Sequence, residues 1–101
     1  MPEELNFQEL SKKVKQSNIK VYVTKGSIIL TLSVKKSEEI LRDGRVVGMK
    51  LSLEANNEIK FYEDSEIAKT TRPLKLIKRY EWCYRVIEED EAIFYIVKQL
   101  E

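Results

Sequence analysis

The chain has 101 residues, a formal net charge of +1, no histidine and one cysteine, with 43% hydrophobic and 35% charged residues. A chain of this length is expected to form a single α+β domain, residues 1–101, and to bury a core without disulfide or metal staples. The near-balanced charge excludes an overall field that would attract nucleic acid or a membrane surface. The high charged fraction is typical of hyperthermophile proteins.

The sequence predicts a soluble, cytoplasmic protein that binds no membrane. Cys83 is the only cysteine, so no internal disulfide can form. The N-terminal residues show no basic segment leading into an apolar run, which argues against a signal peptide. No apolar run approaches the roughly 18 residues of a membrane-spanning helix.

Residues 2–16 predict a helix. Phe7, Leu10 and Val14 recur at three- and four-residue spacing, which places them on one helical face. Acidic side chains lie at the start of this segment and lysines at its end, as the helix dipole favours. We expect the helix to cover the apolar face of a sheet.

Residues 19–34 predict a β-hairpin whose apolar side chains share one face. Side chains alternate between faces along a strand, so the two apolar sets coincide only if the loop holds an even number of residues. A two-residue loop at Lys25-Gly26 meets this condition and pairs Val23 with Ile28. Gly26 would supply the positive φ of the tight turn.

Residues 35–45 fit two structures. In one, Ser37 caps a short helix that ends at Gly44. In the other, Asp43 and Gly44 form a second tight turn that leads into the next strand. The sequence does not decide between them.

Strands are predicted over residues 46–54 and 58–62, where apolar residues alternate. A two-residue turn between these strands would put their apolar residues on opposite faces, so we expect a three-residue loop. Either residues 56–58 or residues 55–57 can fill that loop.

The C-terminal part predicts a second hairpin. Residues 81–88 alternate as a strand, with Trp82 and Tyr84 on one face, and the acidic residues 88–91 mark a turn. Residues 92–100 fit a strand or a helix, and their β-branched and aromatic content favours a strand. The elements together predict an α+β fold: an N-terminal helix packed on a five- to six-stranded, mainly antiparallel sheet built of hairpins.

The predicted sheet has more apolar surface than one short helix covers. This excess implies a second layer or a partner. A symmetric homodimer, formed by a sheet face or by edge pairing, is the simplest solution, and we expect it to use the aromatic C-terminal hairpin.

The composition excludes the common catalytic arrangements. Without histidine and with one cysteine, the chain cannot build a tetrahedral zinc site or pair a Ser or Cys nucleophile with an imidazole. Gly26, Gly44 and Gly48 are isolated, so no glycine-rich phosphate loop occurs. Cys83 alternates with aromatic residues and is expected to be a packed thiol. We therefore expect a non-enzymatic protein without a metal or cofactor.

One carboxylate arrangement gives a remote alternative. Asp43, followed by Glu58-Ile59-Lys60 on a strand, resembles the motif of restriction-endonuclease-like nucleases. In that family an Asp and an ExK sequence on adjacent strands hold Mg²⁺, and the Lys assists the attack of water. By that resemblance Asp43, Glu58 and Lys60 form the site of a Mg-dependent nuclease. The simpler interpretation is a surface pair between Glu54 and Lys60.

Residues 69–85 carry the clearest binding signal, because six basic side chains and one acidic side chain lie there among three aromatic residues. Cations anchor phosphates, and aromatic faces stack on unpaired bases. The predicted nucleic-acid contacts are Arg72, Lys75, Lys78, Arg79, Tyr80 and Trp82. However, Trp82 and Tyr84 share a face with Val86, which is typical of core aromatics and is the favoured interpretation of these two residues.

Two functions of different classes follow. The first is a small non-enzymatic binding protein that contacts nucleic acid through residues 69–85. The second is a homodimeric protein-interaction or structural module that binds no nucleic acid. Salt-dependent binding of an oligonucleotide distinguishes them, because phosphate contacts release counterions.

Overall fold

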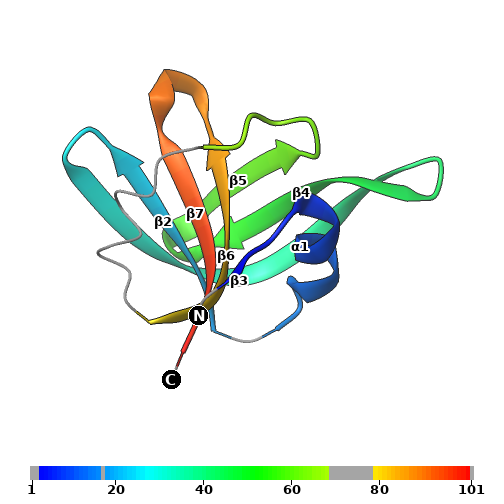
Figure 1. The fold of residues 1–101 in the computed structure, drawn as a ribbon, viewed down its shortest axis with the longest axis horizontal. Coiled ribbons are helices and arrows are strands. Elements are labelled where there is room, and N and C mark those ends of the chain that lie inside the picture. The colour runs from blue at the N-terminus through cyan, green and yellow to red at the C-terminus, as the bar shows by residue number, and fades with distance from the viewer. Residues whose placement is uncertain (1–2, 17, 69–78, 101) are drawn as a thin grey trace.

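The computed structural model describes residues 3–16, 18–68 and 79–100 and shows one short helix with a bent, seven-stranded sheet (Figure 1). The elements are β1 (Glu3–Glu4), α1 (Phe7–Lys13), β2 (Ile19–Lys25), β3 (Ile28–Arg42), β4 (Arg45–Leu53), β5 (Asn57–Tyr62), β6 (Tyr80–Ile87) and β7 (Ile93–Gln99), with 3-10 turns η1 (Glu54–Asn56) and η3 (Glu89–Glu91). The strand order is β1-β6-β7-β2-β3-β4-β5. The short β1 runs parallel to β6, and the other neighbours are antiparallel. A mainly antiparallel sheet is thus confirmed, although the chain is mostly sheet and only roughly α+β.

The 15-residue strand β3 allows the sheet to fold over on itself. Its first half pairs with β2 and its second half with β4. The pairing register shifts between Val34 and Lys36 and again between Ile40 and Leu41. Such irregularities bend a strand and increase its twist. As a result, the inner face of β4 and β5 turns toward the inner face of β6 and β7.

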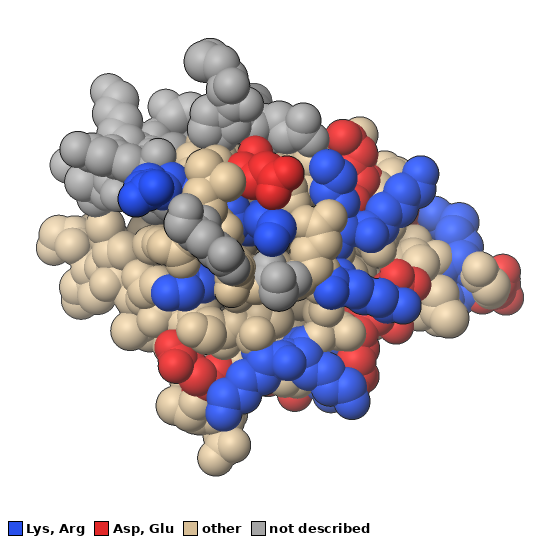
Figure 2. Space-filling model, turned by 90° about the horizontal axis from the view of Figure 1, so that it is seen from below, with Lys and Arg blue, Asp and Glu red and all other residues tan. Residues whose placement is uncertain are grey.

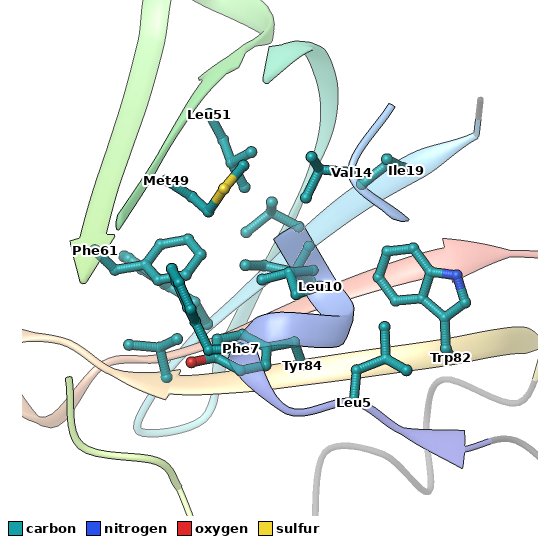
Figure 3. Close-up of a cluster of buried hydrophobic side chains, with 14 of the residues drawn as sticks. Leu5, Phe7, Leu10, Val14, Ile19, Met49, Leu51, Phe61, Trp82 and Tyr84 are labelled. Carbon is teal, nitrogen blue, oxygen red and sulfur yellow. The ribbon is translucent and has the colours of Figure 1, made fainter. Parts of the chain in front are cut away.

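The main core lies between these two inner faces and α1 (Figure 3). Phe61 of β5 stacks on Tyr84 of β6, with ring centroids 5.6 Å apart. Phe7 of the helix meets both rings edge-on, at 6.3 Å from Phe61 and 6.4 Å from Tyr84. Aromatic pairs of this kind contribute about 0.5–1.5 kcal/mol each beyond the area they bury. The helix therefore joins the two halves of the sheet rather than covering one flat face.

Helix α1 is shorter than the sequence predicted. The Asn6 side chain accepts the Glu9 N–H at 2.9 Å, and the Glu9 side chain accepts the Asn6 N–H at 3.2 Å. This capping box fixes the start of the helix. The predicted helix over residues 2–16 is wrong at its start, because β1 pairs with β6. The predicted apolar face is confirmed, since Phe7 and Leu10 are buried.

The first hairpin forms with its loop one residue later than predicted. Gly26 and Ser27 make a two-residue loop, and Gly26 has φ +61 at the first loop position, where type II′ turns place glycine. Val23 therefore pairs with Leu30 and not with Ile28. Moving the loop by one residue shifts the pairing register by two residues, so the apolar side chains stay on the predicted face. However, Ile28 and Leu30 extend past the core and are 71% and 52% exposed.

Residues 35–45 adopt the turn and not the helix. Strand β3 continues to Arg42, and Asp43 and Gly44 form a two-residue loop with φ +53 and +77. Both angles are positive, as a type I′ turn requires.

The loop between β4 and β5 holds three residues, as predicted, but they are residues 54–56. Leu53 pairs with Asn57, so both predicted alignments are wrong. The observed pairing register is shifted from each predicted one by an even number of residues. Because an even shift leaves every side chain on the same face, the apolar faces of β4 and β5 still coincide. Ala55 and Asn56 adopt the left-handed backbone conformation that allows this tight loop.

Residues 92–100 contain strand β7, which confirms the alternative that composition favoured. Strand β7 pairs with β6 on one side and β2 on the other, so a long-range pairing joins the two hairpins. The sequence did not predict this pairing. A second buried cluster lies on the outer face of these strands and includes Cys83, Tyr95 and Val97.

Candidate functional site

The predicted nucleic-acid contacts fall into three groups. Outside the described residues lie Arg72, Lys75 and Lys78. Arg79 is exposed just before β6, and its carbonyl accepts the N–H of Leu100 at 3.1 Å. Tyr80 is half-buried, and Trp82 is buried. Among the described members of the set, Arg79 is therefore the one exposed residue.

Trp82 is a core residue. Its side chain is 1% exposed, and its Nε1 donates to Oε1 of Gln16 at 3.4 Å. In Figure 3 the indole ring lies inside the core with Leu5 and Ile19 close to it. A nucleic-acid base could stack on this ring only after the core had opened. The burial thus agrees with the interpretation of Trp82 as a core aromatic.

Arg85 is also buried, although it lies on the outer face of β6. Its Nη2 donates to Oε1 of Glu4 at 2.7 Å and also contacts Oε2 of the same carboxylate. This pair attaches β1 to β6, beside the hydrogen bond from the Leu5 N–H to the Cys83 carbonyl. Burial raises the pKa of the Cys83 thiol from 9.0 to about 11, and a thiol with a raised pKa is a poor nucleophile. Arg85 and Cys83 therefore have structural roles here.

The structure does not bring the nuclease-like residues together. Asp43 lies in the turn of the β3–β4 hairpin, whereas Lys60 and Glu58 lie on β5, where Glu58 pairs with Ser52 of β4. Arg45, next to that turn, and Ser52 are seven residues apart along β4. At about 3.3 Å per residue this separates them by roughly 23 Å. The described part of the chain contains no group of three or more His, Cys, Asp and Glu side chains that could hold a metal ion.

Lysines from separate segments gather where α1 ends and β2 begins. This end of the sheet faces the viewer in Figure 2, where groups of basic side chains are visible with acidic ones between them. A shallow hollow of about 210 Å³ lies between the end of α1 and the middle of β3. Its polar lining residues are Lys15, Gln16, Asn18, Lys35, Lys36 and Ser37. None of the lining residues that the structure describes is acidic.

A second hollow, of about 200 Å³, adjoins the first because Asn18 lines both. Lys20, Gln99 and Leu100 complete its described lining. Since the Leu100 N–H donates to the Arg79 carbonyl, the exposed Arg79 lies beside this hollow. We call the cationic residues around the two hollows the basic end; they are Lys15, Lys20, Lys35, Lys36 and Arg79.

Two hydrogen bonds hold the segments of the basic end together. The Ser37 hydroxyl donates to the Val14 carbonyl at 2.8 Å and connects β3 to the end of α1. The Gln99 N–H donates to the Asn18 carbonyl at 2.9 Å and connects β7 to the start of β2. The hollows are therefore built by backbone positions that tertiary contacts fix.

One cation of the basic end already has a partner. Lys36 Nζ lies 2.8 Å from Glu38 Oε1, and both side chains are exposed. Their hydrogen bond raises the pKa of Lys36 and lowers the pKa of Glu38. Exposed pairs of this kind contribute little to stability, so Lys36 can exchange Glu38 for the anion of a ligand.

The arrangement suits the binding of an anion rather than catalysis. Lysines contact phosphates as point charges, and Asn and Gln side chains donate hydrogen bonds to phosphate oxygens. The described lining of the two hollows contains no aromatic ring. Contact with a sugar–phosphate backbone is therefore better supported here than stacking on bases.

A larger hollow, of about 320 Å³, lies at the β3–β4 hairpin and has mixed charge. Arg42, Arg45, Glu63 and Asp64 contribute to its lining. Arg45 Nη1 donates to Glu63 Oε1 at 2.7 Å. Because cations and carboxylates alternate here, this hollow favours neither an anion nor a cation.

Sequence reasoning missed the basic end because its members come from distant parts of the chain. Lys15 follows α1, Lys20 lies in β2 and Lys35 in β3. The sequence signal that could have found it was the excess of seven basic over three acidic side chains in residues 19–53. That excess does not say which of the side chains meet in space.

Comparisons with models of protein families, with curated proteins and with solved structures found no match to this chain. Within the described residues, no helix combines the length and the apolar character needed to cross a bilayer.

Proposed function

We propose that the protein is a small non-enzymatic binding protein that contacts the sugar–phosphate backbone of nucleic acid at its basic end. The observation that supports this function best is the pair of adjoining hollows lined by lysines and amides, with no acidic residue in their described lining. Arg79 lies beside the hollows, so the proposed surface continues the stretch 69–85. The predicted contacts Arg72, Lys75 and Lys78 remain part of the proposal.

The proposed binding is electrostatic and indifferent to base sequence. Each cation that contacts a phosphate releases counterions, so the binding constant falls with salt. If all five residues of the basic end contact phosphates, the log–log slope against salt reaches about −4.5 for a duplex and about −3.5 for a single strand. A net charge of +1 adds little attraction from the rest of the surface.

The test is a titration of labelled single-stranded and duplex oligonucleotides followed by fluorescence anisotropy at about 50 and 200 mM salt. If all five residues contact phosphates, we expect affinity to fall roughly 130-fold for the single strand and roughly 500-fold for the duplex between these conditions. The double variant Lys15→Ala/Lys35→Ala should reduce the salt slope by nearly 2, at about 0.9 per lost contact. The matched control is Lys25→Ala/Arg42→Ala, which removes the same charge away from the two hollows and should leave the slope unchanged.

Three results would contradict the proposal or a part of it. Absence of salt-dependent binding would overturn it and favour the interaction module that binds no nucleic acid. Equal effects of the two double variants would place binding away from the basic end. Quenching of Trp82 emission on binding would contradict its place in the core, from which we expect a blue-shifted spectrum that the oligonucleotide leaves unchanged.

The predicted homodimer and the predicted cytoplasmic location remain predictions. Strands β6 and β7 of the aromatic C-terminal hairpin lie inside the sheet, between β1 and β2. A dimer is therefore better supported at the other end of the strand order, where β5 pairs with β4 alone among the described residues.

A further inference from the structure

Strand β5 ends the sheet with an edge whose backbone groups point outward. The Glu63 N–H donates to the Val47 carbonyl at 2.9 Å, and the ladder continues with Phe61 opposite Met49. Backbone groups alternate in direction along an antiparallel strand. The odd-numbered residues of β5 therefore bond to β4, and the backbone groups of the even-numbered residues point away from the sheet.

The open part of this edge is short and well defined. At one end, the Tyr62 N–H donates to the Ser65 hydroxyl and the Tyr62 carbonyl accepts the Ser65 N–H, each at 3.0 Å. This leaves the N–H and C=O groups of Glu58 and Lys60, which no described residue bonds. Both side chains are exposed. Toward the opposite end of the sheet, the edge of β6 is covered, because β1 pairs with β6 and the Ile87 N–H donates to the Glu66 carbonyl.

The sequence of this edge is complementary to itself. When two copies of β5 run antiparallel with Ile59 opposite Ile59, Glu58 of each copy lies directly opposite Lys60 of the other. Glu58 and Lys60 are also the residues whose backbone groups point outward. The same alignment therefore makes two opposite-charge cross-strand pairs and four backbone hydrogen bonds, which use every open group of the two edges.

The charge of Lys50 on β4 also favours pairing of the β5 edge with a second copy. Lys60 lies opposite Lys50 in the β4–β5 ladder, and like charges in that position are unfavourable. Glu58 Oε2 lies 3.5 Å from Lys50 Nζ, whereas Lys60 has no acidic partner among the described residues. The predicted pair between Glu54 and Lys60 does not form, because Glu54 instead accepts the Ser33 N–H. Glu58 of a second copy would supply the missing acid.

We propose that the chain forms a two-fold symmetric dimer by antiparallel pairing of β5 with β5 of a second copy, centred on Ile59. The interface is isologous, as a two-fold axis requires. A strand pair of this length buries a small area, at the low end for specific complexes. The dimer is therefore in reversible equilibrium with the monomer, and this proposal does not depend on the binding of nucleic acid.

The test exploits the symmetry of the two charges. Sedimentation velocity over a series of concentrations should show a monomer–dimer equilibrium for the unmodified chain. Glu58→Lys alone and Lys60→Glu alone each place two like-charge pairs across the axis, and each should weaken dimerisation by about tenfold or more. The double variant Glu58→Lys/Lys60→Glu restores both opposite-charge pairs and should dimerise like the unmodified chain.

A mixture of the two single variants provides the most discriminating test of this interface. Glu58→Lys carries two lysines on its edge and Lys60→Glu carries two glutamates, so each variant repels a second copy of itself. In a mixed dimer the two lysines of one chain face the two glutamates of the other, and the mixture should recover the dimer. Circular dichroism checks that each variant is folded.

Two outcomes would overturn the proposal. The first is a chain that stays monomeric at all concentrations. The second is a dimer that the single substitutions leave unchanged, because its interface would then lie elsewhere.

Discussion

Strands β5 and β6 have similar alternating sequences, but β5 keeps one face exposed and β6 is buried on both faces. In β5, Phe61 is buried while Glu58 and Lys60 remain exposed. In β6, the residues of both faces are buried from Trp82 to Val86. Alternation thus identifies the inner face of a strand, but it does not tell whether the outer face meets water. That second property depends on the position of the strand in the sheet.

The comparison shows which side chains of this molecule a ligand can reach. The aromatic rings of β6 that suggested stacking are used for packing, and its Arg85 is held by Glu4. The accessible charges lie instead at the ends and at the open edge of the sheet. Three predictions on stability test how strongly the two strands differ, in order of decreasing expected effect.

The first prediction compares the same substitution on the two strands. Tyr84→Ala removes a ring that is 1% exposed and stacked on Phe61, and should destabilise the protein by about 3–5 kcal/mol. Tyr62→Ala on β5 removes a side chain that is 39% exposed and should cost less than about 1 kcal/mol. The measurement is urea unfolding followed by far-UV circular dichroism. Equal losses for the two variants would refute the contrast between the strands.

The second prediction concerns the outer face of β6 and alkaline pH. The thiol of Cys83 has a pKa raised from 9.0 to about 11, first by burial and then by the charge of Glu4. Between these values the unfolded chain holds fewer protons than the folded one, so stability falls as pH rises from 9.0 to about 11. The full loss is about 2–3 kcal/mol, of which about 1.3 kcal/mol appears between about pH 8 and 10.

The control for this prediction is Cys83→Ala, which removes the titrating group. The variant should be less stable at about pH 8 but should lose about 1.3 kcal/mol less than the unmodified chain between about pH 8 and 10. Burial also raises the pKa of Tyr84 and Tyr95, and these groups act in the same direction in both proteins. Parallel pH curves for the two proteins would show that Cys83 is not shielded from water in the folded state.

The fold was predictable where a residue pattern has one physical solution. The buried face of β4 and the three-residue length of the loop after it follow from local chemistry, whereas the turn at Asp43-Gly44 is one of two structures between which the sequence does not decide. The exact registers did not follow, because a shift of two residues keeps every side chain on its face and changes only which backbone groups bond. The loop at Gly26-Ser27 differs from the predicted one in this way. Local pattern therefore determines faces better than it determines partners.

The candidate site was less predictable than the fold. Whether Trp82 stacks on a base or packs in the core depends on Leu5 and on Ile19 of β2, which are distant from it in sequence but lie close to its ring. Lys15, Lys20 and Lys35 meet only because β2 starts beside the end of α1 and β3 passes the same point. Neither fact is encoded within any one segment. To predict either one, the tertiary pairing of β7 with β2 had to be known first.

The third and smallest prediction has the opposite sign. The Tyr84 hydroxyl is buried and has no hydrogen-bond partner in the part of the chain that the structure describes. A buried hydroxyl without a partner has lost its bonds to water and gained none in return. Tyr84→Phe keeps the ring contacts with Phe7 and Phe61 and removes only this hydroxyl, so it should stabilise the protein by about 1 kcal/mol.

The matched control is Tyr62→Phe, which removes an exposed hydroxyl from β5 and should change the free energy of unfolding by less than about 0.5 kcal/mol. Both variants are measured by the same urea unfolding as the alanine pair. A loss of stability in Tyr84→Phe would mean that the hydroxyl is hydrogen-bonded in solution, for instance to a buried water. The combination of a large loss in Tyr84→Ala with a gain in Tyr84→Phe would assign the whole contribution of this residue to its ring. The inner face of β6 would then be shown to act by packing alone, which is the property that separates it from the charged edge of β5.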